Sequence, residues 1–265
     1  DNYAWHTDLP PGHTLVTGQQ TIDFDLALVE NSEVVTLWGM NWIVTKMPDS
    51  HWLTEARLKG TKVIVIACEY QATANKADEV VIIRPGTDSA LALGIAQILL
   101  RDNKYDAAFV KNFTDLPLLV RTDTRQLLRA SEVVPGYTNA TLTKTRVYAP
   151  TDTVPKPGEH REQWLPQALR TKWGDYCVWD LTGGAPAAVS RDEVGADFAG
   201  KGLDPALTGT FTVNLVAGGT AEVRPLIAVL AEHLANSYTP ADVEAITGAK
   251  AATVEALAAE LALHR

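Results

Sequence analysis

A carboxylate lies between two histidines near the start of the chain, at His6, Asp8 and His13. Asp and His side chains are ordinary ligands of metal ions in proteins. Pro10 and Pro11 follow Asp8, and because proline fixes φ and removes an N–H donor, they could hold that carboxylate in one orientation. The same segment also has the composition of an exposed proline-rich loop. The residue types therefore leave two interpretations open, a metal site and a surface loop.

Three further loops, residues 39–49, 68–70 and 84–88, each follow an apolar run and carry side chains that suit a nucleotide. Gly39 allows a backbone to approach a ligand, and the Asn41 amide both donates and accepts hydrogen bonds. A carboxylate such as Glu69 is where nucleotide-binding sheets often hold ribose hydroxyls. Asp88 can accept both N–H donors of a guanine edge. The candidate ligand contacts in these loops are Gly39, Asn41, Asp49, Glu69, Tyr70, Arg84, Gly86 and Asp88.

A purely structural interpretation of these loops stays open beside the nucleotide site. The chain has no G-x-G-x-x-G and no Walker A motif, so the general phosphate-binding signatures are absent. Gly39 could then be a simple turn, Asp88 a helix cap and Glu69 a solvated loop acid.

The elements that must position the loops alternate between strand and helix. Apolar runs at 33–38, 62–68 and 80–83 predict strands, and the second has almost no polar face, as in parallel strands covered on both sides. Asp49 or Ser50 can cap a predicted helix that runs to about Lys59 and stops at Gly60, and residues 89–101 form another. This alternation predicts an α/β fold with a doubly wound, mainly parallel, Rossmann-like sheet, whose ligands lie beyond the carboxyl ends of the strands.

The remainder of the chain divides by composition. Residues 1–30 form the loop segment with Asp8, 31–135 the Rossmann-like core and 136–225 an irregular Pro- and Gly-rich insertion with a small β element. Residues 226–265 return as helices, one of which begins at Thr239-Pro240 and ends at Gly248. Because the chain begins without Met and ends in a helical stretch, we expect it to be a piece of a longer polypeptide.

Charge and cysteine content exclude several classes of protein. With 23 Lys and Arg against 32 Asp and Glu, the net charge is -9, and no basic stripe is present to bind nucleic acid. No apolar run is long enough to cross a bilayer. Cys68 and Cys177 are too few for a disulfide framework, a zinc site or an iron–sulfur cluster.

Several ordered motifs together resemble one family. They are Trp5-x-x-Asp8-Leu9-Pro10-Pro11, Thr17-Gly18-Gln19-Gln20-Thr21, Trp38-Gly39-Met40-Asn41, Arg84-Pro85-Gly86-Thr87-Asp88 and the stretch 113–120. In these the chain is similar to catalytic subunits of the complex iron–sulfur molybdoenzymes, the nitrate reductase and nitrite oxidoreductase branch of the dimethyl sulfoxide reductase superfamily. The similarity is dense over residues 1–135, thin over 136–225, and returns at 238–240 and 246–248.

The resemblance implies a bis(molybdopterin guanine dinucleotide) cofactor whose molybdenum is bound by an aspartate, here Asp8. His6 and His13 would then be hydrogen-bond donors or proton carriers near the metal. Asn41, Glu69 and Asp88 would lie where the family holds one guanine dinucleotide. The chain departs from the family at Glu69, because the branch more often has a Pro-Asp pair there. Since the two cysteines cannot hold a cluster, the iron–sulfur cluster is expected in a part of the subunit outside this sequence.

The implied activity is oxygen-atom transfer between Mo(IV) and Mo(VI), with nitrate reduction or nitrite oxidation as the first choice. Enzymes acting on chlorate, perchlorate, selenate, dimethyl sulfide or ethylbenzene are alternatives within the branch, and a metal-free scaffold homologue is an alternative outside enzymes. The implied partners are an iron–sulfur beta subunit, a haem or membrane-anchor subunit and a small oxyanion substrate, without nucleic acid. The periplasmic and the cytoplasmic face of an energy-transducing membrane both stay open.

Overall fold

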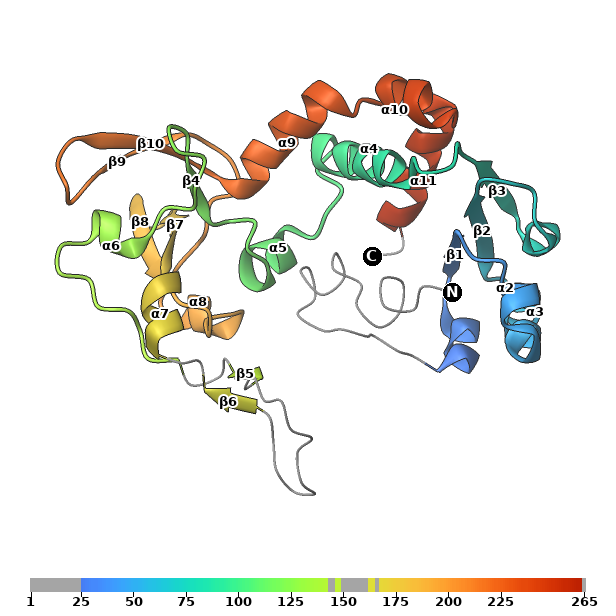
Figure 1. The fold of residues 1–265 in the computed structure, drawn as a ribbon, viewed down its shortest axis with the longest axis horizontal. Helices are drawn as coiled ribbons and strands as arrows, with labels where there is room; N and C mark the ends of the chain where they lie inside the picture. Colours follow the sequence, from blue (N-terminus) through green and yellow to red (C-terminus); the bar gives the residue numbers. More distant parts are fainter. Residues whose placement is uncertain (1–24, 143–145, 149–161, 165–166, 264–265) are drawn as a thin grey trace. The chain divides into compact units, whose positions relative to one another are not determined.

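The computed structural model describes residues 25–142, 146–148, 162–164 and 167–263. The chain forms two compact units (Figure 1). Unit 1 combines Asp1–Ala92 with Val243–His264, and unit 2 contains Leu93–Asp242. The helix α4 (Asp88–Arg101) runs from the first unit into the second.

Unit 1 is built on a three-stranded parallel sheet in the order β1-β2-β3. The strands are β1 (Val34–Trp38), β2 (Lys62–Ala67) and β3 (Glu79–Ile82), and their register pairs Val35 with Val63 and Val65 with Val80. The four central residues of β2, 63–66, are at most 1% exposed. A β-branched strand with no polar face is therefore the buried centre of the sheet, as its sequence predicts.

One face of this sheet is covered by α3 (Ser50–Leu58), which follows η2 (Leu26–Asn31), α2 (Trp42–Thr45) and η3 (Met47–Asp49). Leu53 and Ala56 of the helix pack with Leu37 and Val65 of the strands. The helix ends at Leu58, and Gly60 with φ +105° then turns the chain back toward β2. The helix start at Ser50 and the stop at Gly60 agree with the sequence prediction.

The remaining elements of unit 1 are η4 (Ala72–Lys76), α10 (Pro240–Thr247), whose residues from Val243 on belong to this unit, and α11 (Ala251–Leu263). The start of α10 is fixed by a reciprocal cap, because Asp242 Oδ2 accepts from the Thr239 hydroxyl at 2.6 Å and the Asp242 N–H donates to Thr239 Oγ1 at 3.3 Å. Gly248, with φ +82°, ends the helix. The predicted helix from Thr239-Pro240 to Gly248 is thus confirmed. On α11, Glu260 pairs with Lys62 of β2 at 2.7 Å.

Unit 2 contains only antiparallel sheets among its described residues. Its strands are β4 (Leu119–Arg121), β5 (Arg146–Tyr148), β6 (Glu162–Trp164), β7 (Tyr176–Asp180), β8 (Ala185–Val189), β9 (Phe211–Asn214) and β10 (Thr220–Pro225). They pair as β4-β10-β9, β5-β6 and β7-β8. The helices are α5 (Ala107–Phe113), α6 (Ala130–Val133), α7 (Gln167–Trp173), α8 (Ala196–Gly200) and α9 (Leu226–Ser237).

The core of unit 2 joins β4, β7, β9 and β10 through Leu119, Cys177, Val213 and Val223. Trp179 and Phe211 stack nearly parallel with their ring centroids 4.1 Å apart. Burial raises the pKa of the Cys177 thiol to about 12, so this side chain is a protonated core residue.

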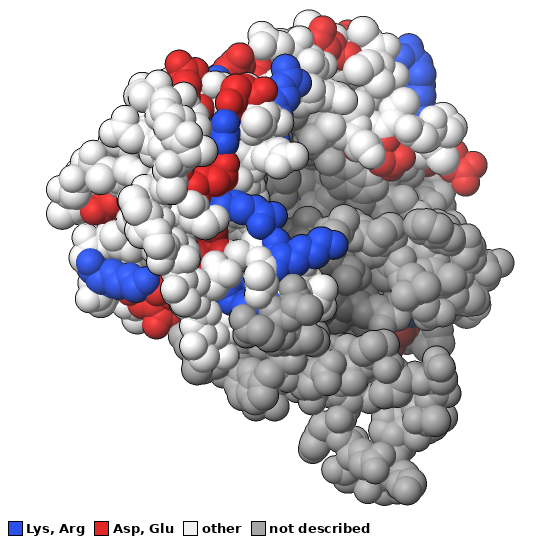
Figure 2. All heavy atoms as spheres, turned by 60° about the vertical axis from the view of Figure 1, so that its left-hand side comes forward, with Lys and Arg blue, Asp and Glu red and all other residues white. Residues whose placement is uncertain are grey.

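Charged side chains of both signs are mixed on the face of the chain seen in Figure 2, where most blue atoms lie near red ones. Ion pairs in unit 2 follow this pattern, for example Arg121 with Asp123 at 2.7 Å and Lys111 with Asp204 at 2.5 Å. In the ranges that the structure describes, no helix combines the length and the apolar character that a bilayer span requires.

The prediction of an α/β chain with a parallel sheet is confirmed. The predicted strands at 33–38, 62–68 and 80–83 are β1, β2 and β3 within two residues at each end. Within residues 136–225, where a small β element was expected, the structure has the strands β7 and β9. Their partners β8 and β10 were not foreseen, because the pattern of either strand alone does not show what it pairs with.

Candidate functional site

The carboxyl ends of β1, β2 and β3 meet at one edge of the parallel sheet. The Gly39 N–H donates to the Ile66 carbonyl at 2.8 Å, and the Ile83 N–H donates to the Ala67 carbonyl at 2.9 Å, so the three loops leave the sheet side by side. We call residues 39–49, 68–76 and 84–88 the strand-end rim. All of it belongs to unit 1. The structure thus brings the three predicted loops together at the edge where open α/β sheets bind ligands.

Asn41 ties the first two loops of the rim to each other. Its Oδ1 accepts from the Thr73 hydroxyl at 2.8 Å and from the Thr73 N–H at 3.2 Å. Thr73 is fully buried and in turn accepts from the Ile43 N–H at 3.2 Å. Gln71 Nε2 donates to the Met40 carbonyl at 2.9 Å. The amide oxygen of Asn41 is therefore used within the chain, and its Nδ2 group is the part that can donate to a ligand.

Asp88 lies at the start of α4 and contacts the end of β1. Trp38 Nε1 donates to Asp88 Oδ1 at 2.7 Å, across 50 residues of sequence. Asp88 is exposed and Trp38 is 36% exposed, so the pair faces solvent at the rim. The carboxylate also lies in the first helical turn, where the helix dipole favours a negative charge.

Arg84 braces the third loop against the end of α10. Its Nη1 donates to the carbonyls of Ala245 at 2.6 Å and Ile246 at 2.8 Å, and its backbone N–H donates to the Thr247 carbonyl at 2.8 Å. A cation at a helix C-terminus satisfies carbonyls that have no partner within the helix. This guanidinium therefore has a structural task, and contact between Arg84 and a cofactor stays a prediction.

Two glycines of the rim have left-handed backbones beside open space. Gly39 has φ +67° and Gly86 has φ +76°, a region that residues with a side chain adopt at a cost. A Cβ atom built on either glycine would meet no other atom within 4 Å. The backbone at Gly39, after β1, and at Gly86, after β3, is therefore open to the approach of a ligand.

The other predicted ligand-contacting residues lie on the same rim, but their contacts within the described structure do not identify a ligand. Glu69 and Tyr70 are exposed just after β2, Tyr70 by 66%. Asp49 precedes α3, where its side chain makes no capping bond while its carbonyl accepts from Trp42 Nε1 at 3.2 Å. His6, Asp8 and His13 lie outside the described residues.

The rim also uses residues that sequence reasoning did not select, namely Trp38, Gln71 and Thr73. The signal for Trp38 was its place as the last residue of a strand, directly before a glycine. Gln71 and Thr73 had no signal beyond being polar residues in a loop, because their partners Met40 and Asn41 lie about thirty residues away.

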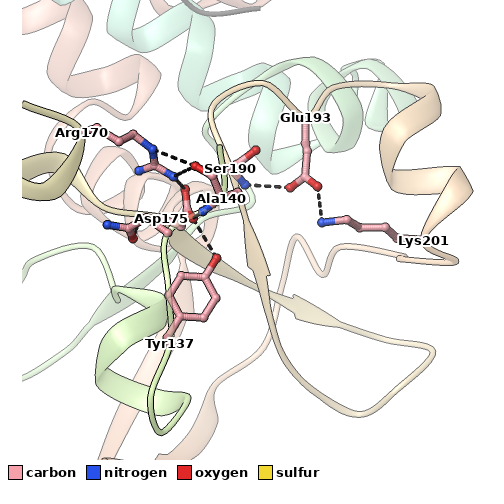
Figure 3. A network of polar contacts seen from close by, with 8 residues as sticks. Tyr137, Ala140, Arg170, Asp175, Ser190, Glu193 and Lys201 are labelled. Carbon is pink, nitrogen blue, oxygen red and sulfur yellow. Dashed lines mark hydrogen bonds and ion pairs between the residues drawn. The ribbon is translucent and has the colours of Figure 1, made fainter. Parts of the chain in front are cut away.

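A second polar cluster lies in unit 2 around the buried ion pair of Arg170 and Asp175 (Figure 3). Tyr137 Oη donates to Asp175 Oδ2 at 2.7 Å, and the Ala140 N–H donates to the same oxygen at 2.8 Å. Arg170 also donates from Nη2 to the Ala140 carbonyl at 3.0 Å. Burial and the contact with Asp175 raise the pKa of Tyr137 well above its ordinary value. The cluster therefore fixes the backbone at Ala140, while Arg170 Nη1 is buried without a hydrogen-bond partner in the described part of the chain.

Two hollows in the described surface lie away from the carboxyl ends of β1, β2 and β3. One of ≈ 570 Å³ in unit 2 is lined by Arg121, Arg125, Arg224 and His233 among others. The other, ≈ 610 Å³, lies at the amino ends of the strands of unit 1, near Lys62 and Asp78. Neither contains a predicted site residue, and within the described ranges no three His, Cys, Asp or Glu side chains gather into a metal site.

Comparison with known proteins adds to this geometry. Residues 1–255 match the family model for molybdopterin oxidoreductase. The alpha subunit of perchlorate reductase from Dechloromonas aromatica is 34% identical over 98% of this chain and 27% of its own length. The alpha subunit of respiratory nitrate reductase from Haloferax mediterranei is 33% identical over 98% of this chain and 24% of its own length.

The alpha subunit of chlorate reductase from Ideonella dechloratans is 36% identical over 44% of this chain and 14% of its own length. The chain therefore spans about a quarter or less of the length of these three curated relatives.

Proposed function

The chain belongs to the molybdopterin oxidoreductase family, whose cofactor is molybdenum bound by molybdopterin, and from this premise we propose that the chain is the part of a catalytic alpha subunit that binds one guanine dinucleotide of the cofactor. The cofactor, when bound, supplies oxygen-atom transfer between Mo(IV) and Mo(VI). This chain's own residues bind, orient and enclose it.

The strand-end rim is the observation that carries the proposal. Its polar groups suit a guanine nucleotide: an amide that can donate at Asn41, carboxylates that accept at Glu69 and Asp88, and open backbone at two glycines. A carboxylate can accept the paired N–H donors of guanine, and Gly backbones allow close approach of a phosphate or ribose. The parallel strand ends support a Rossmann-like binding mode for the unit.

We assign the role of metal ligand to Asp8 on the resemblance of its Trp-x-x-Asp-Leu-Pro-Pro setting. Asp8 and its two neighbouring histidines lie outside the described residues, so their part in the proposal rests on sequence. His6 and His13 would donate hydrogen bonds or carry protons beside the metal.

The proposed substrate is a small oxyanion. Nitrate or nitrite is our first candidate, and the relatives named above support perchlorate and chlorate equally. Selenate, dimethyl sulfide and ethylbenzene are less directly supported. The proposed partners are an iron–sulfur beta subunit and a haem or membrane-anchor subunit, and the iron–sulfur cluster of the alpha subunit itself would lie outside this sequence.

Elemental and nucleotide analysis of the purified full-length subunit tests the enzyme assignment directly. We expect molybdenum, and we expect guanosine monophosphate to be released on acid hydrolysis at two per molybdenum. A protein with neither would be the metal-free scaffold homologue, and the proposed function would be withdrawn.

Replacing the assigned metal ligand is a sharper test of the mechanism. Asp8→Ala in the full-length enzyme is expected to lower turnover by more than about a thousandfold, because loss of an essential group commonly costs that much. Asp102→Ala is the control, since Asp102 makes exposed pairs with Arg101 and Lys104 and should leave turnover unchanged. Retained activity in the Asp8 variant would refute the ligand assignment.

A dye-linked assay with nitrate, nitrite, chlorate, perchlorate and ethylbenzene separates the substrates. The proposal expects the ratio kcat/KM to be highest for one of the oxyanions. Activity with the hydrocarbon alone would contradict it.

A further inference from the structure

We propose that Trp38 is a positioning residue, which holds the Asp88 carboxylate in the orientation that accepts the paired N–H donors of guanine and so sets the base preference of the rim. This inference rests on the proposed function. Trp38 lies in a region that the family resemblance includes, but its contact with Asp88 is an observation of this structure.

The sheet explains why a tryptophan is needed at this place. β1 and β3 are separated by β2, and since neighbouring strands lie ~4.8 Å apart, the loop after β3 begins about 10 Å from the end of β1. In register, Trp38 is opposite Ile66, and Ile66 is opposite Val81, so all three side chains lie on one face of the sheet. An indole is long enough to extend across this distance, and its N–H supplies a donor.

The contact itself orients a side chain that would otherwise be free to rotate. Asp88 is exposed, and the described structure gives its carboxylate one side-chain partner, the Trp38 N–H at 2.7 Å. A short N–H bond to one carboxylate oxygen restricts rotation about both side-chain torsions. Binding a base then requires less ordering of the carboxylate, which is how preorganisation increases affinity.

Both carboxylate oxygens stay usable for a ligand. Each ionised oxygen has about two lone-pair sites, so Oδ1 can accept from the indole and from a base together, while Oδ2 makes no hydrogen bond within the described part of the chain. Guanine presents two adjacent N–H donors, and hypoxanthine presents only one of them. A fixed carboxylate therefore discriminates between the two bases, whereas a rotating one discriminates less.

The test uses the full-length subunit produced in a host that cannot make the cofactor, with guanosine and inosine monophosphate as probes. Trp38→Phe retains an aromatic ring but removes the N–H. We expect it to weaken guanosine monophosphate binding about three- to tenfold, the effect of one hydrogen bond, and to change inosine monophosphate binding much less. Trp52→Phe, on α3 and packed against the core of the same unit, controls for general loss of stability and should change the binding of neither nucleotide.

A double-mutant cycle separates positioning from a direct effect of the ring. Asp88→Asn should remove the preference for guanine, because an amide presents a donor in place of one acceptor. If Trp38 acts through Asp88, then Trp38→Phe adds no further loss in the Asp88→Asn background. Additive losses, or an unchanged guanosine-to-inosine ratio in Trp38→Phe, would overturn the inference.

The outcomes also distinguish this inference from the proposed function. A wild-type subunit that binds neither nucleotide, or one in which Asp88→Asn has no effect, contradicts the guanine site itself. A wild-type subunit with a preference that depends on Asp88 but not on Trp38 leaves the site in place and removes only the positioning role.

Discussion

At the residue scale, the buried pair of Arg170 and Asp175 gives the strongest prediction of a local loss of stability. The two side chains are 5% and 0% exposed, and Asp175 also accepts from Tyr137 and from the Ala140 N–H. Asp175→Asn removes the charge that compensates Arg170, and leaving one buried charge without its partner typically costs about 3–5 kcal/mol. Native-state hydrogen exchange should therefore show faster exchange of the Ala130 and Ala140 amides, which bond to Asp175.

The matched control is the neighbouring surface pair in Figure 3. Lys201 contacts Glu193 but is 47% exposed, so Lys201→Ala should cost less than about 1 kcal/mol. Equal effects of the two variants would mean that burial does not decide the strength of these pairs.

Asp180 gives a prediction of pH dependence. Its carboxylate accepts from the N–H groups of Asp204 at 2.9 Å, Gly183 at 2.7 Å and Thr182 at 3.1 Å, and these bonds hold the pKa of the carboxyl below its ordinary value. A group with a lowered folded-state pKa stabilises the fold above its unfolded pKa, and that contribution is lost as the pH falls through the folded value. For Asp180 the loss begins below about pH 4.

Asp180→Asn should then destabilise the turn by about 2 kcal/mol at pH 7 and by progressively less as the pH falls below 4. The quantity to measure is the difference in exchange rate of the Gly183 and Asp204 amides between wild type and variant, at several pH values and after correction for intrinsic exchange. A difference independent of pH would show that the ionised carboxylate is not the stabilising form.

At the scale of elements, Arg84 links the loop after β3 to the end of α10. Arg84→Met retains the aliphatic stem and removes the two bonds to the Ala245 and Ile246 carbonyls. Since the site is exposed, we expect a loss of about 1 kcal/mol, confined to this junction. Faster hydrogen exchange at the Gly248 and Arg84 amides, with unchanged exchange in the central strand β2, would be the signature. Slower or unchanged exchange at both amides would contradict the bracing role.

Local elements were predictable because their signals are local. The run 63–66 is β-branched and apolar throughout, and Thr239, Pro240 and Asp242 specify a helix start by their own side chains. Pairings between distant segments were not predictable in the same way. β4 pairs with β10 about a hundred residues later, and nothing in Leu119–Arg121 alone identifies Thr220–Pro225 as its partner.

In the candidate site, too, the part set by a local or general rule was predictable and the long-range contacts were not. That Gly39, Asn41 and Asp88 share an edge follows from the rule that parallel strands end together, and the structure agrees. The hydrogen-bond partner of each side chain does not follow from that rule. Asn41 bonds Thr73, Asp88 bonds Trp38 and Arg84 bonds the end of α10, and every one of these partners is at least thirty residues away.

At the scale of the molecule, the two compact units differ in what they offer a nucleotide. All residues of the strand-end rim belong to unit 1, whereas the hollow with Arg121, Arg125 and Arg224 belongs to unit 2. The arginines of that hollow are partly neutralised, because Arg121 pairs with Asp123 and Glu132 while Arg224 pairs with Glu232. A charged ligand therefore gains less from them than their number suggests.

This difference predicts where the cofactor protects the backbone. In the full-length enzyme, a ligand that binds the folded state raises the free energy of opening of the segments it contacts. Comparing cofactor-loaded with cofactor-free subunit by hydrogen exchange, we expect strong protection at residues 39–45, 71–74 and 84–91. The amides of β4, β9 and β10 should exchange at nearly unchanged rates. Protection concentrated around Arg121 and Arg224 instead would move the nucleotide site to unit 2, and the rim would then be only the structural end of a sheet.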